Sequence, residues 1–278
     1  MKLSNMKKLS KKYNFFLFDQ WGVLHDGNKI FKFTNKTIEK IKKKNLILIS
    51  NTSQTVSEFK LQTLKKLKLN YMHFNKIVTA GEALINISNK LKSSRISNII
   101  KNKKAYIISN NNEKQLVKKL HIKKVNYLNC KFILSLSLNP IKNFNNIISK
   151  LEFLSKKKIP MICTNPDIYT FNKGSRLYQI GFIAKKYSDL GGKVYYIGKP
   201  YKDIFNNLVK KKDKKKTIIV GDNLDTDILG GKKYKIKTAL ALDGYKKLNL
   251  IKSDNLAIKE ILKNKIKPDY IIKDISIS

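Results

Sequence analysis

Three aspartates and one lysine, far apart in the chain, each follow closely on a short apolar run: Asp19, Lys199, Asp222 and Asp227. Runs of aromatic and β-branched residues that end in a polar cluster are typical of buried strands. In open α/β sheets, the chemistry gathers at the carboxyl ends of the strands. We therefore expect these four side chains to converge at one edge of a sheet.

Such a cluster has a definite chemistry. Two aspartates from neighbouring strands, Asp19 and Asp222, can hold a hard divalent cation such as Mg²⁺. Lys199 would lower the pKa of Asp19 and neutralise a phosphoryl group. Ser50, at a predicted helix N-terminus, suits phosphate oxygens, although it could merely cap that helix. Asp227 could likewise be a first-turn acid favoured by the helix dipole. The set permits attack by the Asp19 carboxylate on phosphorus and hydrolysis of the resulting aspartyl-phosphate.

The elements that must position these residues alternate between strand and helix. We expect strands over 14–18 and 46–49 and helices over 34–44 and 55–69 in the first part of the chain. Later strands are expected over 194–197, 217–220, 237–242 and 268–272, with helices over 201–208 and from 226 to 230. This alternation predicts an α/β fold with a doubly wound parallel sheet and right-handed crossovers.

A long insertion interrupts this pattern. Residues 81–190 contain their own predicted strands over 105–109, 132–138 and 161–164, and a helix over 143–155 separates the last two. Gly191 and Gly192 mark the return to the first unit. We expect a core domain made of 1–80 plus 191–278 and an inserted α/β domain over 81–190.

Four ordered motifs resemble those of the haloacid-dehalogenase-like (HAD) hydrolase superfamily: Phe-Asp19-x-x-Gly22-Val-Leu, Ser50-Asn51-x-Ser53, Gly198-Lys199-Pro200 and Gly221-Asp222-x-x-x-Thr226-Asp227-Ile228. The insertion between the second and third motifs resembles that of the NagD-like subfamily IIA. It carries Thr164-Asn165-Pro166-Asp167 near its end, and the tail Pro268-Asp269-Tyr270 fits the same subfamily. The resemblance covers about 15–272.

The resemblance implies a Rossmann-like core, a mobile C2-type cap domain and a Mg²⁺-dependent phosphatase that acts on a small phosphorylated metabolite. It makes Asp19 the nucleophile and Lys199 the catalytic cation that stabilises the phosphoryl group. Asp19, Asp222 and the backbone carbonyl of Trp21 would hold the metal, and Asp227 would orient Asp222 and Lys199. The implied phosphate- and substrate-binding residues are Ser50, Asn51, Thr164, Asn165 and Asp167.

Trp21 departs from the superfamily pattern. Phosphatases of the superfamily carry a second aspartate at this position, and that aspartate protonates the leaving group and then activates water. Indole can do neither, so the alternative is a phosphoryl-ligand binding protein with little turnover. The opening Asp-x-Trp-Gly-Val-Leu-His-Asp-Gly nonetheless resembles a bacterial branch of NagD-like proteins classed as hydrolases. Asp26 before Gly27 is typical of a turn, and His25 of a loop or core histidine.

Composition limits the partners. The formal net charge is +40, but only Arg95 and Arg176 are arginines, so 57 of the 59 basic residues are lysines. Proteins that recognise bases and phosphates favour the bidentate arginine fork, which argues against specific nucleic-acid binding.

Cys130 and Cys163 lie in apolar runs, which predicts that both are core residues. No run reaches membrane-spanning length, and we expect a cytoplasmic protein without a membrane partner. A homodimer stays open, because cap surfaces in related folds often dimerise.

Overall fold

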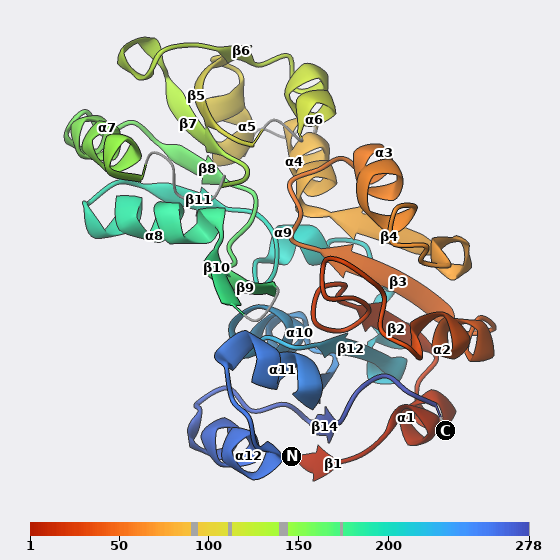
Figure 1. The fold of residues 1–278 in the computed structure, drawn as a ribbon. Helices are drawn as coiled ribbons and strands as arrows, with labels where there is room; N and C mark the ends of the chain where they lie inside the picture. The colour runs from red at the N-terminus through yellow and green to blue at the C-terminus, as the bar shows by residue number, and fades with distance from the viewer. Residues whose placement is uncertain (90–93, 111–112, 139–143, 173–174, 278) are drawn as a thin grey trace.

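The chain forms two parallel sheets that helices cover on both faces (Figure 1). The computed structural model describes residues 1–89, 94–110, 113–138, 144–172 and 175–277. Within these residues the larger sheet has the strand order β1-β14-β13-β12-β2-β3-β4, and the smaller one β11-β8-β7-β5-β6. A separate antiparallel hairpin, β9–β10, lies between them. The predicted α/β class with a doubly wound core sheet and an inserted α/β domain is confirmed.

The larger sheet collects segments from both ends of the chain. Its strands are β1 (Lys2–Leu3), β2 (Phe15–Phe18), β3 (Asn45–Ser50), β4 (Lys76–Thr79), β12 (Thr217–Gly221), β13 (Lys237–Ala241) and β14 (Tyr270–Ile272). The helical segments that accompany it are α1 (Met6–Lys12), α2 (Thr34–Lys40), α3 (Val56–Phe59), η1 (Lys60–Leu64), η2 (Tyr71–His73), α9 (Lys202–Phe205), η4 (Lys211–Lys216), η5 (Leu224–Ile228), α10 (Leu229–Tyr234), α11 (Leu242–Asn249) and α12 (Asp254–Lys263).

The smaller sheet is built from the middle of the chain. Its strands are β5 (Lys104–Ile108), β6 (Lys123–Lys124), β7 (Phe132–Ser135), β8 (Met161–Cys163) and β11 (Val194–Tyr196). Around it lie α4 (Ala80–Ser88), α5 (Arg95–Ile100), α6 (Lys114–Lys119), η3 (Tyr127–Asn129), α7 (Phe144–Lys156) and α8 (Ile180–Asp189), and the hairpin is formed by β9 (Tyr169–Asn172) and β10 (Ser175–Tyr178). The predicted start of the helix over 143–155 falls on residue 143, outside the described residues.

One strand lies in a different sheet from the one expected. The glycine pair at 191–192 predicts a return to the core domain, which would put the predicted strand over 194–197 in the larger sheet. That expectation is wrong for the strand itself, because β11 pairs in parallel with β8 of the smaller sheet. The apolar pattern of a buried strand does not say which sheet it joins. The domain boundaries at 80/81 and 190/191 stay a prediction.

The two faces of β2 explain why its sequence is apolar without interruption. Phe16 and Phe18 point into a cluster with α1 and α2, whereas Leu17 points into a second cluster on the opposite face. Successive side chains of a strand alternate between faces, so a strand covered on both sides must be apolar throughout. Asp19 follows directly and lies at the carboxyl end of this central strand.

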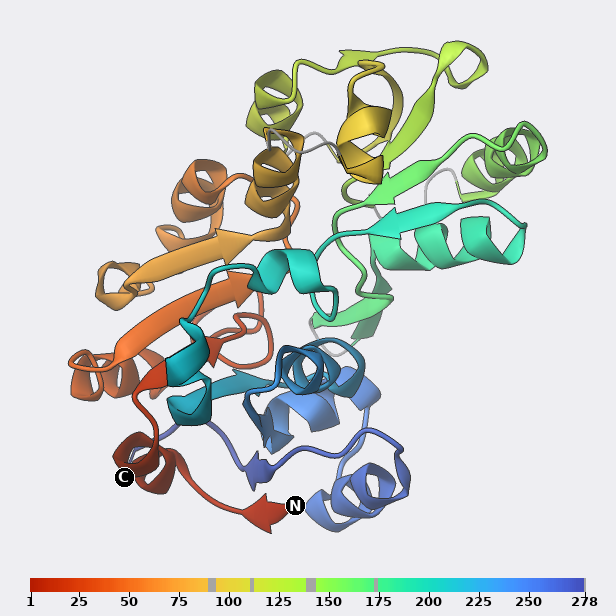
Figure 2. The same ribbon diagram turned by 180° about the vertical axis from the view of Figure 1, so that it is seen from behind.

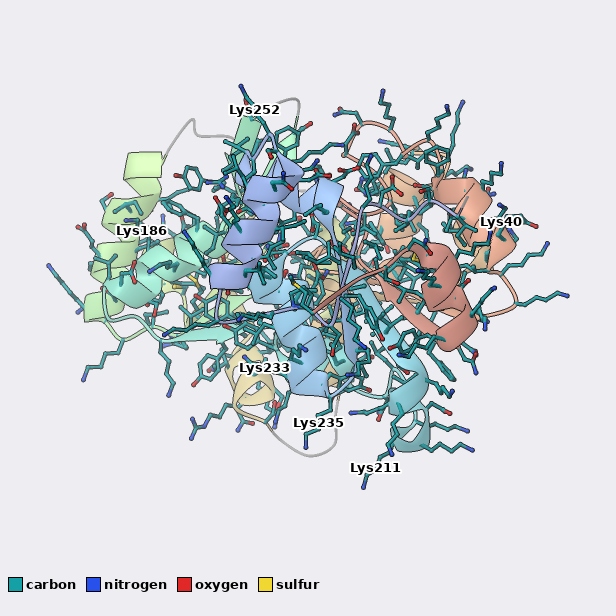
Figure 3. The ribbon with its side chains drawn as sticks, turned by 90° about the horizontal axis from the view of Figure 1, so that it is seen from below. Lys40, Lys186, Lys211, Lys233, Lys235 and Lys252 are labelled. Atoms are coloured by element: carbon teal, nitrogen blue, oxygen red, sulfur yellow. The ribbon has the colours of Figure 1, made fainter. Side chains whose placement is uncertain are left out.

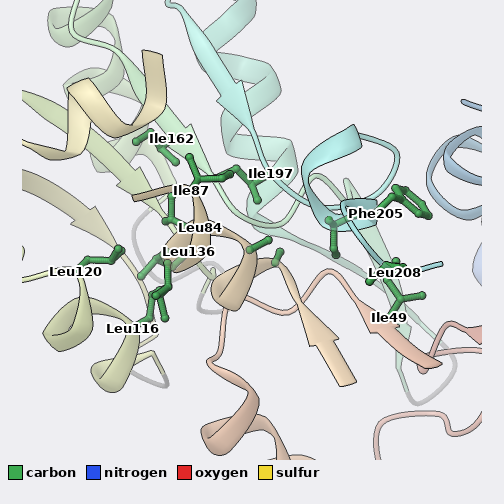
Figure 4. Packing of buried hydrophobic residues seen from close by; sticks show 14 of the residues in the cluster. Ile49, Leu84, Ile87, Leu116, Leu120, Leu136, Ile162, Ile197, Phe205 and Leu208 are labelled. Carbon is green, nitrogen blue, oxygen red and sulfur yellow. The ribbon is translucent and has the colours of Figure 1, made fainter. Parts of the chain in front are cut away.

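The second cluster continues from the larger sheet into the smaller one. Figure 4 shows Ile49 of β3, Leu84 and Ile87 of α4, Leu116 of α6 and Leu120 directly after α6 among its members. Ile162 of β8 and Phe205 of α9 belong to it as well. The two sheets therefore share one hydrophobic core, with α4 packed between them. Seen from behind, α4 and α9 lie where the larger sheet meets the smaller one (Figure 2).

Exposed lysines lie on many elements of the structure. Figure 3 labels some of them, and the exposed Lys40, Lys186, Lys211 and Lys252 extend outward in different directions in this view. Both cysteines are buried and unpaired, as expected of core residues. None of the described helices combines the length and the apolar character that crossing a bilayer requires.

Candidate active site

Strand ends of the larger sheet and the loop after β11 bring four predicted residues together. The Lys199 ammonium lies 2.5 Å from Oδ1 of Asp19 and 2.7 Å from Oδ1 of Asp227. Lys199 is 2% exposed and Asp19 is 8% exposed, so both ion pairs lie in the interior. Asp227 also accepts a hydrogen bond through Oδ2 from the backbone N–H of Asn223, 3.2 Å away. It therefore fixes both Lys199 and the chain segment that follows Asp222.

Carboxylate oxygens of Asp19, Asp222 and Asp227 come within 4.8 Å of one another. Gly22, with φ +76°, makes room for this arrangement, because a Cβ there would lie 1.8 Å from Oδ2 of Asp222. Three buried carboxylates face one ammonium group, which leaves an excess of negative charge. Oxygen donors with uncompensated negative charge are what a hard divalent cation requires. The residues present therefore fit a Mg²⁺-type ion.

The pKa values reflect this crowding. Burial raises the pKa of Asp19 to about 7, although the charge of Lys199 opposes the rise. The sequence led us to expect that Lys199 lowers the pKa of Asp19, and it does so through its charge and its hydrogen bond, but desolvation by burial is larger and the net pKa is raised. Burial and the charges of Asp19 and Asp227 likewise raise the pKa of Asp222 well above its usual range. Burial opposes the charged form of Lys199, but Asp19 and Asp227 outweigh it, so the pKa of Lys199 is raised.

Asn51 forms hydrogen bonds with both Lys199 and Asp167. Its Oδ1 accepts from the backbone N–H of Lys199 at 2.6 Å, and its Nδ2 donates to Oδ1 of Asp167 at 3.1 Å and to the carbonyl of Lys199 at 3.2 Å. Gly198, with φ +114°, lies against this amide, and a Cβ there would come within 2.8 Å of Asn51 Oδ1. Asn51 thus positions Lys199 and Asp167 from its place after β3.

A buried chain of hydrogen bonds orients Ser50. The backbone N–H of Gly27 donates to Nδ1 of His25, so the other ring nitrogen, Nε2, carries the proton and donates to Oε1 of Gln20 at 2.9 Å. Gln20 Nε2 then donates to Ser50 Oγ at 2.8 Å. Burial lowers the pKa of His25 to about 4, so the ring stays neutral near pH 7. Sequence reasoning missed Gln20, and it correctly treated His25 as a core histidine.

Trp21 contacts the hairpin of the inserted segment. Its indole Nε1 donates to the backbone carbonyl of Phe171 in β9 at 2.8 Å. The ring packs on Gly27, where a Cβ would lie 2.3 Å from a ring carbon, and against His25 in an edge-on arrangement. Asn28 donates to Asn172 next to this contact at 2.9 Å. Trp21 therefore joins the loop after β2 to the hairpin through its indole N–H.

A cavity of about 250 Å³ opens in front of Asp19. Asp19, Trp21, Ser50 and Asn51 line its floor, and Asp167 with Asn165 comes from the inserted segment. Burial raises the pKa of Asp167 to about 6, against the effect of Lys199. The cavity thus holds the predicted nucleophile and most of the predicted binding residues.

Thr164 has a different place. It is buried and donates to Ser53 Oγ at 2.6 Å, and Ser53 in turn donates to the carbonyl of Leu136 at 2.5 Å. Thr164 is absent from the described lining of the cavity. These bonds tie the loop after β3 to the smaller sheet. Its neighbours Asn165 and Asp167, in contrast, line the cavity.

Sequence reasoning also missed several polar residues that line the cavity. Gln54, Glu113, Thr170 and Gln179 line it, and Glu113 is only 4% exposed. They lie in loops and at helix starts, where polar residues are common for many reasons. Only the tertiary contacts of the inserted segment bring them to one place.

Two family comparisons cover most of the chain. The family described as "Haloacid dehalogenase-like hydrolase" matches residues 16–124, and the family described as "HAD-hydrolase-like" matches residues 196–277. The glycerol-3-phosphate phosphatase of Rattus norvegicus is 26% identical over 148 residues, which cover 50% of this chain and 44% of the relative. The ribonucleotide monophosphatase NagD of Escherichia coli (strain K12) is 32% identical over 112 residues, which cover 39% of this chain and 43% of the relative. The matched regions thus span less than half of either relative.

The fold is similar to solved structures over almost the whole chain. A haloacid-dehalogenase-like hydrolase from Brucella suis 1330 superposes with a TM-score of 0.79 at 18% identity, and the match covers 98% of this chain and 99% of the other. This likeness includes both sheets and the segment inserted between the motifs.

Proposed function

Because the chain belongs to the haloacid-dehalogenase-like hydrolases and is of the NagD-like type, we propose that it is a phosphatase acting on small phosphorylated metabolites. The observation that carries this proposal is the buried group of Asp19, Lys199 and Asp227 at the carboxyl end of β2, next to Asp222 and a cavity. Its two ion pairs hold a carboxylate where phosphorus would be attacked.

In the proposed reaction, an oxygen of Asp19 attacks phosphorus, the bond to the leaving-group oxygen breaks, and water later hydrolyses the aspartyl-phosphate. Lys199, held protonated by Asp19 and Asp227, balances the charge of the phosphoryl oxygens. Ser50, oriented by Gln20, and the backbone N–H groups after it would bind these oxygens. Asp19 and Asp222, with the backbone carbonyl of Trp21, would hold Mg²⁺, which supplies further positive charge beside the phosphoryl group.

The cap hairpin would complete the site. Trp21 holds β9 over the cavity through Phe171, and closure over a phosphate ester excludes water from the first step. Asp167 and Asn165 would contact the substrate from the inserted segment. The compartment that we propose is the cytoplasm.

A phosphate-release assay tests the proposal. The wild type, incubated with Mg²⁺ and a set of phosphate monoesters, should release phosphate, whereas Asp19→Asn should lose the activity, by at least about 10³-fold, because no carboxylate oxygen remains to attack. Asp189→Asn, which removes an exposed charge paired with Lys185, is the matched control and should keep full activity. Equal rates for the wild type and Asp19→Asn would contradict the proposal.

A second candidate function is phosphoryl-ligand binding with little turnover. Trp21 favours it, because its N–H is bonded to Phe171 and it cannot replace the acid–base aspartate, whose help is typically worth about 10² to 10⁴ in rate. In that case phosphate analogues should raise the melting temperature in the presence of Mg²⁺ while no ester is hydrolysed. Trp21→Asp should then create measurable phosphate release.

A further inference from the structure

The cavity beside Asp19 differs from the rest of the molecule in charge. Lysine and arginine make up 59 of the 278 residues, yet none of them is among the described residues that line this cavity. The charged lining residues are Asp19, Asp167 and Glu113, all of them acidic. Lys199 is not among the described lining residues; it is 2% exposed and is paired with Asp19 and Asp227. The charged groups that the described lining offers to the remainder of a substrate are therefore acidic.

Among the acids of the described lining, Glu113 is the one to which the proposed reaction gives no role. It precedes α6, is 4% exposed, and accepts a hydrogen bond from Ser109 Oγ at 2.6 Å. Ser137, also on the cavity, is its second side-chain partner. Burial raises the pKa of Glu113, and the nearby Glu58 adds to the rise. Hydroxyl partners leave the charge of the carboxylate unbalanced, and a ligand that brought hydrogen-bond donors or positive charge would compensate it.

The other polar groups of this wall are neutral amides and hydroxyls. Gln54, Thr170 and Gln179 line the cavity with Glu113, and Phe59 contributes an apolar surface. Amides and hydroxyls can both accept from and donate to ligand hydroxyl groups. A carboxylate or second phosphate on the ligand would instead meet Glu113 and Asp167 without a cation from the described lining. Like charges placed together repel, so the described lining disfavours such a ligand.

We propose that the protein selects phosphate monoesters whose leaving group carries hydroxyl or ammonium groups and no negative charge, and that Glu113 makes this selection. The proposal rests on the proposed phosphatase function for its kinetic readout only, because the same preference applies to binding. The strongly positive surface attracts every anionic ester alike. The acidic residues of the cavity lining then discriminate among these esters.

A pair of substrates of nearly equal size tests the proposal without any variant. Glycerol 3-phosphate and 3-phosphoglycerate share a three-carbon skeleton, and the second has a carboxylate where the first has a hydroxymethyl group. We expect kcat/KM to be at least about 10-fold higher for glycerol 3-phosphate. Phosphoethanolamine, which carries an ammonium group, should also be accepted. Equal or better use of 3-phosphoglycerate would overturn the proposal.

Variants assign the selection to Glu113. Glu113→Gln keeps the shape and removes the charge, so the preference for glycerol 3-phosphate should shrink severalfold, and phosphoethanolamine should suffer most. Glu113→Lys should reverse the preference. Glu152→Gln, an exposed glutamate of α7, is the matched control for net charge and should leave the preference unchanged. A preference that persists unaltered in a folded Glu113→Gln protein would remove Glu113 from the assignment.

Binding separates the two proposals. Calorimetric titration of Asp19→Asn with the same esters and Mg²⁺ measures affinity without turnover. If the wild type hydrolyses no ester, including p-nitrophenyl phosphate, the phosphatase function fails, but tighter binding of glycerol 3-phosphate than of 3-phosphoglycerate would still support the selection. Equal affinity for both, or binding of neither, would overturn it.

Discussion

At the scale of single residues, Trp21 is both a part of the candidate site and its departure from the family pattern. The indole is in the loop that carries Asp19, yet its hydrogen bond goes to the hairpin of the inserted segment. The residue that replaces an acid–base group therefore serves contact between two parts of the chain. The loss of acid–base catalysis at Trp21 and the stability that its contact gives the hairpin can be measured separately.

Trp21→Phe should loosen the hairpin. The substitution keeps an aromatic ring but removes the N–H that donates to Phe171, a loss of about 1 kcal/mol of local stability. Trypsin should then cleave faster after Arg176, which lies in β10 and donates to the carbonyl of Leu248. Phe153→Leu, on the outer face of α7, is the control and should leave cleavage at Arg176 unchanged. Cleavage at the wild-type rate in Trp21→Phe would contradict the role of this contact.

His25 should make stability depend on pH. Its pKa is about 4 in the folded protein and 6.5 as the ordinary value, so the unfolded chain binds the proton first as pH falls. The stabilisation is complete above pH 6.5 and is lost progressively between 6.5 and 4, by about 3 kcal/mol in total.

The measurement compares two proteins. Urea unfolding of the wild type and His25→Gln at several pH values gives a difference in free energy of unfolding, which should fall as pH drops from 6.5 to 4. Taking the difference removes the other titrating groups, such as Glu113, whose raised pKa acts in the opposite direction. A difference that is constant over this range would show that His25 is not buried in its neutral form.

The sequence was sufficient for the residues that follow strands and insufficient for those that reach the site through tertiary contacts. Asp19, Asp222 and Lys199 follow apolar runs, and the geometry of a parallel sheet brings such positions together. Glu113 and Gln179 have no such pattern, because a loop residue reaches a cavity only through the packing of its domain. The pKa of Asp19 depends on burial, which spacing along the chain does not reveal.

At the scale of elements, α4 connects the two sheets. It follows β4 directly and packs Leu84 and Ile87 into the hydrophobic cluster that both sheets share (Figure 4). Because the two sheets lie so close together, the sequence alone could not show which sheet β11 joins. Its apolar residues would suit either sheet, and only its pairing with β8 decides the matter.

Leu84→Ala should destabilise both sheets together. The side chain is fully buried, and truncation of such a leucine typically costs about 2–5 kcal/mol, depending on how far the cavity collapses. Thermal unfolding should remain a single transition at a lower temperature, with circular dichroism and tryptophan fluorescence giving the same midpoint. Leu262→Ala, at an exposed position of α12, is the control with little expected effect. Two separate transitions in Leu84→Ala would show that the sheets unfold independently.

At the scale of the whole molecule, we expect the net charge of +40 to act as a long-range field rather than as a binding site. Lysines such as Lys40, Lys186, Lys211 and Lys252 extend outward in different directions (Figure 3), and the described lining of the cavity beside Asp19 contains no lysine. Such a field accelerates encounters with all anions and is screened by salt.

Nucleic-acid binding should follow the same field. Random-sequence duplex DNA should bind at low salt, and the logarithm of its affinity should fall linearly with the logarithm of salt concentration, leaving weak binding at physiological ionic strength. Fluorescence anisotropy with two unrelated duplexes measures both the slope and any sequence preference. Tight, sequence-dependent binding at physiological salt would contradict the view that the charge is unspecific.

The hydrophobic cluster that both sheets share also limits which parts of the molecule can move relative to one another. Swinging the smaller sheet away from the larger one would expose apolar side chains of the shared cluster, at about 25 cal/mol for each Å². Among the described residues, the side-chain hydrogen bonds that lifting the hairpin would break are those of Trp21, Asn28 and Arg176, together with the packing of β9 on α11. We therefore expect ligands to enter and leave through a local gate while the outline of the molecule stays constant. Small-angle scattering should give the same radius of gyration with and without a phosphate analogue. Hydrogen exchange should slow over 169–172 and 175–178 when the analogue binds. A shrinking radius would point to whole-domain closure instead.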